Sequence, residues 1–247
     1  MFMRSARTEK KPVYPSSWQS LSQGESIKAE LERACGPLTE RLFGYHMVRL
    51  GILSSDVALD SCRIKHIVNV TELPHHSTNL RGMSRELPLQ QNSVDAFFLA
   101  AELDFAQDPH QILREVDRAI TANGHVVIAG FNPFSLAGLM KYMPINRGNL
   151  LHQGRFFTCA RIKDWLQLLG FEIIQHEHVM YSSLFSNNRF LPGSRLQSLC
   201  KTYFPAFASM YILVARKREI PLSTIKQKWH VNKPNFAPAS ASMRSKN

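Results

Sequence analysis

The sequence lacks several features that would place it in a large functional class. No apolar run approaches the roughly 18–20 residues that a helix needs to cross a bilayer, and no apolar stretch follows the basic start MFMRSARTEKK. We therefore expect no membrane span and no secretory signal. No CxxC pair occurs among the four cysteines, Cys35, Cys62, Cys159 and Cys200. This argues against a zinc ribbon or dithiol site and favours buried free thiols in a cytoplasmic protein.

Acidic residues are also scarce, with 19 Asp and Glu against 30 Lys and Arg, which gives a net charge of +11. The excess sits at the ends of the chain. Residues 1–14 carry +3 and residues 216–247 carry +7, which leaves +1 for everything between them. A basic tail can bind nucleic acid or acidic lipid. We favour a solvated, disordered end, because the tail also contains the Pro-, Ser- and Asn-rich run NKPNFAPASAS.

The length of 247 residues and the hydrophobic content of 44% suffice for one sizeable core. We expect an irregular N-terminal extension over residues 1–23, one domain over 24–217, and a basic, disordered tail over 218–247.

Predicted helices and strands alternate along this domain. The predicted helices cover 24–43, interrupted at Gly36-Pro37, then 108–120, capped by Asp108, and 159–170. The predicted strands cover 45–52, 66–70, a weak strand within 80–93, then 94–101, 125–131, 171–179 and 209–217. Such alternation predicts an α/β fold with a mostly parallel sheet covered by helices on both faces. Ligands of such sheets lie beyond the carboxyl ends of the strands, beside the first strand.

One segment resembles a known family. Residues 86–133 read ELPLQQNSVDAFFLAAELDFAQDPHQILREVDRAITANGHVVIAGFNP. An acidic-Leu-Pro loop, an SVD entry into an apolar strand, a DP helix start, the LREVDR helix and an NGHVVIAGFNP turn and strand follow one another in order. This set resembles the class I S-adenosylmethionine-dependent methyltransferases with a methyltransferase-11-like domain, including small bacterial proteins of this type. The resemblance implies a Rossmann-like seven-stranded sheet with an antiparallel last strand, and methyl transfer to a small-molecule acceptor.

The resemblance also implies where the cofactor S-adenosylmethionine would lie, and this chain departs from the family there. The glycine-rich turn after the first strand retains only Gly51, since Leu53 and Ser55 replace the later glycines. Asn69 stands near the acidic position that binds ribose, with Glu72 further along, and Met83 stands where an adenine-contacting Asp is usual. The cofactor-binding residues implied in this chain are Gly51, Leu53, Asn69, Met83, Ser84 and Ala101.

No catalytic residue stands out, because methyl transfer can proceed largely by holding the reactants in line. Asp104 is the first candidate, because no structural role is evident for it in the sequence, and Glu102 is a weaker one. Asp108 is more simply a helix cap. Asn132-Pro133 resembles a motif that grips nucleobase amines, but it follows the fifth strand rather than the fourth and lacks the second Pro, so we predict a turn.

We expect no metal site, because His75-His76 and His176/His178 have no companion Cys and no His-Glu-x-x-His spacing. Two alternatives to an active methyltransferase remain open. The altered cofactor positions also suit a binding or regulatory protein on this fold, and the basic tail suits an RNA-directed methyltransferase, which we favour least.

Overall fold

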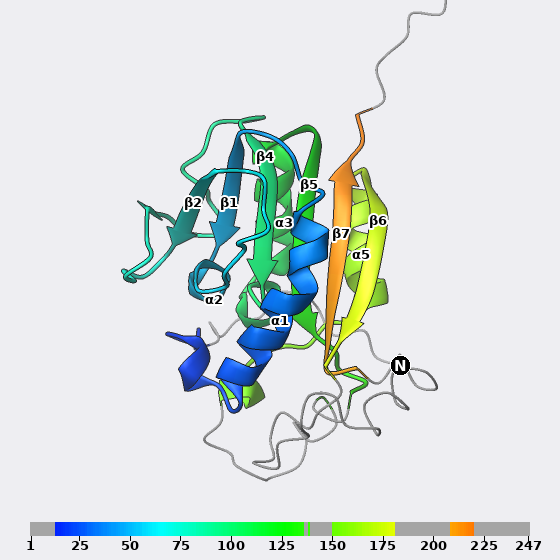
Figure 1. The fold of residues 1–247 in the computed structure, drawn as a ribbon. Helices are drawn as coiled ribbons and strands as arrows, with labels where there is room; N and C mark the ends of the chain where they lie inside the picture. Colours follow the sequence, from blue (N-terminus) through cyan, green and yellow to red (C-terminus); the bar gives the residue numbers. More distant parts are fainter. Residues whose placement is uncertain (1–12, 136–137, 139–149, 181–207, 220–247) are drawn as a thin grey trace, which may run out of the picture.

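A seven-stranded sheet forms the centre of the protein in a computed structural model, which describes residues 13–135, 138, 150–180 and 208–219 (Figure 1). The strands are β1 (His46–Leu50), β2 (His66–Thr71), β3 (Leu80–Arg81), β4 (Val94–Ala100), β5 (Ile120–Phe131), β6 (Phe171–Val179) and β7 (Met210–Lys217). Their order is β3-β2-β1-β4-β5-β7-β6. All pairings are parallel except those of β7, which runs antiparallel to β5 and β6. The predicted sheet, including its antiparallel last strand, is confirmed.

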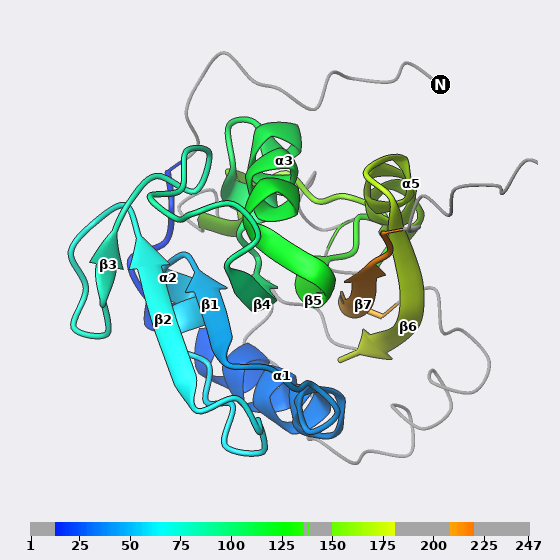
Figure 2. The same ribbon diagram turned by 90° about the horizontal axis from the view of Figure 1, so that it is seen from above.

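Helices cover both faces of this sheet, as Figure 2 shows from above. The α-helices are α1 (Gly24–Thr39), α2 (Ile52–Ser55), α3 (Pro109–Ala119) and α5 (Cys159–Leu168). Short 3-10 turns lie at Trp18–Ser20, Leu103–Phe105 and Leu150–His152. Helix α1 lies on one face, and α3 and α5 lie on the other. None of the described helices is long and apolar enough to span a bilayer.

Alternate residues of the central strands pack into two hydrophobic cores, because successive side chains of a strand point to opposite faces of the sheet. In β4, Phe98 joins the core beneath α1, whereas Phe97 joins the core beneath α3 and α5. Both side chains are fully buried. This explains why β4 reads as a continuous apolar run.

Two helix ends show how local sequence acts. The cap of α3 is confirmed, since the Asp108 carboxylate accepts a hydrogen bond of 3.1 Å from the Gln111 amide. The interruption expected at Gly36-Pro37 is wrong, because α1 continues to Thr39. Pro37 lies in the last turn of the helix, where its missing N–H costs one hydrogen bond with little helix left to break.

The expected lead-in before residue 24 packs against the domain over its described part. Trp18 is buried, and its indole N–H donates to the Leu53 carbonyl at 2.9 Å. Cys35, Cys62 and Cys159 carry free thiols. The predicted tail lies outside the described residues from position 220 onward.

Candidate functional site

A cleft lies beyond the carboxyl ends of β1, β2 and β4, beside the point where strand order reverses between β1 and β4. Its larger cavity, of about 210 Å³, is lined by Val13, Tyr14, Gly51, Ile52, Glu72, Leu73, Ser84 and Glu102. A smaller cavity, of about 80 Å³, is lined by Tyr14, Glu72, Met83, Ser84, Arg85, Glu102, Phe105, Ala106, Gln107, Asp108 and Ile112. Tyr14, Glu72, Ser84 and Glu102 line both cavities, so the two are neighbouring parts of one cleft.

Gly51 forms the turn from β1 into α2. Its backbone adopts φ +89°, a region that favours glycine, and its amide donates to the Val70 carbonyl of β2 at 2.9 Å. A Cβ atom at this position would lie 1.9 Å from a Glu102 carboxylate oxygen and 2.4 Å from the Tyr14 hydroxyl. The bare backbone of Gly51 therefore contacts two side chains of the protein itself.

Leu53 and Ser55, which stand where the resemblance implies glycines, turn away from the cleft. Leu53 is fully buried in the core beneath α1. The Ser55 hydroxyl donates to the Gly51 carbonyl at 2.9 Å, and the Ser54 hydroxyl accepts from the Ala100 amide at 2.7 Å. Neither Leu53 nor Ser55 lines either cavity. The loss of glycine at these positions does not fill the cleft.

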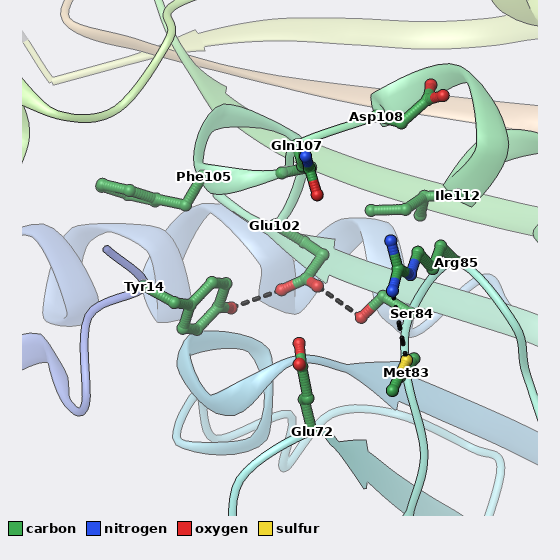
Figure 3. A pocket seen from close by; sticks show the side chains of 11 residues that line it. Tyr14, Glu72, Met83, Ser84, Arg85, Glu102, Phe105, Gln107, Asp108 and Ile112 are labelled. Atoms are coloured by element: carbon green, nitrogen blue, oxygen red, sulfur yellow. Dashed lines mark hydrogen bonds between the residues drawn. The ribbon is translucent and has the colours of Figure 1, made fainter. Parts of the chain in front are cut away.

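Glu102 is the most perturbed acid of the cleft. It is the second residue after β4, its side chain is buried, and it accepts hydrogen bonds from the hydroxyls of Tyr14 and Ser84 (Figure 3). Burial, with a smaller contribution from nearby Glu72, raises the pKa of Glu102 to about 7, although the two hydroxyl donors act to lower it. Burial and Glu102 also hold the pKa of Tyr14 well above its usual value. Glu102 can therefore exchange a proton near neutral pH.

Glu72, rather than Asn69, faces the cleft after β2. Figure 3 shows its carboxylate pointing toward Glu102. The buried Asn69 side chain accepts from Arg49 Nε at 2.7 Å and donates to the Ser77 carbonyl at 2.6 Å, and it lines neither cavity. A carboxylate that could accept hydrogen bonds from ribose hydroxyls is thus present three residues beyond the expected one.

The remaining predicted site residues divide into two groups. Met83 and Ser84 line the cleft, Met83 in the smaller cavity only. Ala101 and Asp104 line neither cavity. The amide of Ala101, at φ +53°, donates to the Ala129 carbonyl at 2.8 Å, and the buried Asp104 carboxylate accepts from the Phe131 amide at 3.1 Å. These contacts join the turn after β4 to β5.

The cleft also contains residues that sequence reasoning missed or ranked low. Tyr14 carries no local signal, because its role depends on contacts with a segment 88 residues away. Glu102 does carry one, since it is the first charged residue after the apolar run of β4. The predicted turn at Asn132 is present, and its carboxamide oxygen accepts from the Phe134 amide at 3.1 Å.

Comparisons with known proteins agree with this fold. Residues 42–128 match the family model described as a methyltransferase domain. The uncharacterized protein YafS of Escherichia coli K12 is 35% identical over 245 residues, covering 98% of this chain and 97% of YafS.

Solved structures share the fold at lower identity. One, from Thermotoga maritima, is described as an S-adenosylmethionine-dependent methyltransferase and possible histamine N-methyltransferase; it is 18% identical with a TM-score of 0.54, covering 81% of this chain and 100% of that one. The [4+2]-cyclase SpnF is 17% identical with a TM-score of 0.51, covering 79% of this chain and 81% of that one. The chain therefore belongs to the family of YafS, its residues 42–128 match a methyltransferase domain, and its fold is shared with solved S-adenosylmethionine-dependent methyltransferases.

Proposed function

We propose that the protein binds S-adenosylmethionine in the cleft beside Gly51 and transfers its methyl group to a small-molecule acceptor. The observation that carries this proposal is the convergence of Gly51, Glu72, Ser84 and Glu102 on one cleft beyond the carboxyl ends of the strands. This is where a doubly wound sheet binds nucleotide-like ligands.

The residues of the cleft suit this cofactor in two respects. The carboxylate of Glu72 can accept hydrogen bonds from ribose hydroxyls. Met83 and Ser84 lie on the loop after β3, next to the smaller cavity, where we place the nucleobase. When bound, the cofactor supplies an electrophilic methyl group. The protein contributes by positioning the ligands and excluding water.

Glu102 is the residue that we assign to proton handling. It lines both cavities, so a ligand that spans the cleft contacts it. With a pKa of about 7 it can donate a hydrogen bond when protonated and accept a proton when ionised. This makes it a stronger candidate than Asp104, whose carboxylate is directed to the β5 backbone.

Calorimetric titration with S-adenosylmethionine and S-adenosylhomocysteine tests the proposal. We expect binding of both, weakened roughly 10- to 100-fold in Glu72→Gln, because a hydrogen bond to a charged group contributes about 1.5–3 kcal/mol. Glu86→Gln is the matched control, since Glu86 is exposed and lines neither cavity. Absence of binding for both compounds at millimolar concentration would overturn the proposal.

A second candidate is a binding or regulatory protein that no longer catalyses methyl transfer. It is favoured by the contact of Tyr14 and Glu102 with Gly51, because these side chains occupy the space that a ligand would need to approach the backbone. The fold is compatible with either role, since one fold hosts many functions. Mass spectrometry of the purified protein distinguishes the two, because a retained cofactor that turns over with an acceptor argues against the second.

A further inference from the structure

Asp56, His75 and His76 form a cluster beside the cleft, although the sequence suggested no metal site. Asp56 follows the last residue of α2, and the two histidines lie in the loop between β2 and β3. The Asp56 Oδ1 atom lies 3.6 Å from His75 Nδ1 and 3.9 Å from His76 Nε2. One ligand atom from each residue lies within 4.8 Å of the others.

The Oδ1 atom of Asp56 is buried and has no hydrogen-bond donor among the described residues, whereas the residue as a whole is partly buried. Its side chain is 10% exposed, and Oδ1 accepts no hydrogen bond within the described part of the chain. Burial lowers the pKa of Arg49, and nearby Asp56 acts in the opposite direction. Its guanidinium nevertheless donates to Asn69 and to the Val57 carbonyl. A buried carboxylate oxygen without a donor needs a partner.

We propose that Asp56, His75 and His76 bind a divalent transition-metal cation of the zinc class. Imidazole nitrogen and carboxylate oxygen are ligands that zinc prefers, at about 2.0–2.2 Å. Tetrahedral ligands at such distances lie about 3.3 Å from one another. The separations of 3.6 and 3.9 Å from Asp56 Oδ1 are close to this value, and all three ligand atoms lie within 4.8 Å of one another, so the side chains must move toward one another to close on an ion.

Hydrogen bonds within the loop between β2 and β3 hold His75 in place. The His75 backbone amide donates to the Thr78 hydroxyl at 2.9 Å, and the His75 side chain is 13% exposed. The Ser77 hydroxyl lies 2.9 Å from His75 Nδ1, and a cation would displace it from that atom. His76 is 79% exposed, so water can complete the coordination on the outer side.

A cation here would fasten the loop after β2 to the end of α2. This loop begins with Glu72 and Leu73, which line the larger cavity. The site would thus stabilise one wall of the cleft. The inference does not depend on methyl transfer, because it concerns residues outside both cavities.

Calorimetric titration of the full, tag-free chain with Zn²⁺ tests the proposal. We expect one equivalent to bind, and we expect His75→Ala and Asp56→Asn each to weaken binding at least tenfold, since loss even of groups that only support a metal ligand costs roughly 10- to 100-fold. X-ray absorption of the zinc-loaded protein should show nitrogen and oxygen at about 2.0–2.2 Å and no sulfur at about 2.3 Å.

His66→Ala is the matched control. His46 and His66 form another exposed imidazole pair, with Nδ1 atoms 2.8 Å apart. This pair belongs to no three-ligand group among the described residues. Its loss should leave zinc affinity unchanged. Circular dichroism at the titration temperature confirms that each variant is folded.

Three results would overturn the proposal. The first is the absence of stoichiometric zinc binding, in which case the cluster is only a contact between polar side chains. The second is zinc binding that His75→Ala and Asp56→Asn leave intact, and the third is zinc coordination through sulfur.

Discussion

The turn after β1 and the turn after β4 meet across the cleft and illustrate opposite relations between sequence and structure. The turn after β1 lacks the later glycines that the resemblance to class I methyltransferases implies, yet Leu53 and Ser55 point inward and leave the cleft open. The turn after β4 has an ordinary sequence, yet it places the buried carboxylate of Glu102 against Gly51. An altered motif therefore need not alter a site, whereas an unremarkable residue can change its chemistry.

Restoring glycine in the turn after β1 should test this comparison with the largest effect. Leu53→Gly leaves a cavity in the core, which costs about 2–5 kcal/mol for the truncation, plus about 1 kcal/mol for glycine in a helix. Ser55→Gly, the matched control in the same turn, should cost only about 1–2 kcal/mol through one hydroxyl contact and the same glycine penalty. Urea denaturation measures both values.

Cofactor titration of the same variants tests the other half of the comparison. Neither substitution should tighten S-adenosylmethionine binding, because neither side chain lines the cleft. A Leu53→Gly variant that keeps its stability and binds the cofactor more tightly would show that Leu53 points into the site.

Adding a single methyl group at Gly51 should have the next largest effect. Gly51→Ala forces a side chain into a backbone conformation that costs about 1–3 kcal/mol, and its Cβ would overlap the Glu102 carboxylate. We expect a total loss of roughly 2–5 kcal/mol in the free energy of unfolding. Gly36→Ala is the control, because its Cβ meets only a Ser61 hydroxyl at 3.6 Å, and it should stabilise α1 by about 1 kcal/mol.

A double-mutant cycle isolates the part of the Gly51 effect that comes from Glu102. Shortening Glu102 to Ala in the Gly51→Ala background should recover the overlap with the Glu102 carboxylate, whereas the conformational part and the overlap with the Tyr14 hydroxyl should remain. Strict additivity of the two substitutions would mean that the two turns do not contact each other as described.

The sequence predicted the scaffold well because the signals involved are local and repeated. The apolar run of β4, the Asp108 cap and the amphipathic α3 each act through neighbouring residues, so each could be identified without a partner. The interruption predicted at Pro37 was wrong, because the effect of a proline depends on how many helical residues follow it. The packing of α1 against the sheet outweighs one missing hydrogen bond.

The site was predicted less completely, since its properties arise from distant pairs. Gly51, Met83 and Ser84 could be placed at the cleft by position in the fold. The sequence could not show that Glu72, rather than Asn69, faces the cleft after β2. That outcome depends on the hydrogen bonds of Asn69 with Arg49 and Ser77. Tyr14 lies in a segment whose sequence suggests an irregular extension, and only the folded chain brings it to Glu102.

The protonation of Glu102 provides the finest test of the turn after β4. Its pKa rises from an ordinary 4.5 to about 7 on folding, so between these values the folded state binds a proton that the unfolded state has released. The contribution of this proton to the free energy of unfolding is complete below pH 4.5. It is lost as the pH rises toward and through about 7, and the total loss is about 3 kcal/mol.

Urea denaturation at pH 5 and pH 8 should show a smaller decrease in the free energy of unfolding for Glu102→Gln than for the wild type. Ser93→Ala is the control, because the Ser93 hydroxyl donates to the Gln90 carbonyl and not to Glu102. This variant should retain the wild-type decrease. Equal decreases for Glu102→Gln and the wild type would mean that Glu102 titrates as it does in water, and that burial in this turn does not hold its proton.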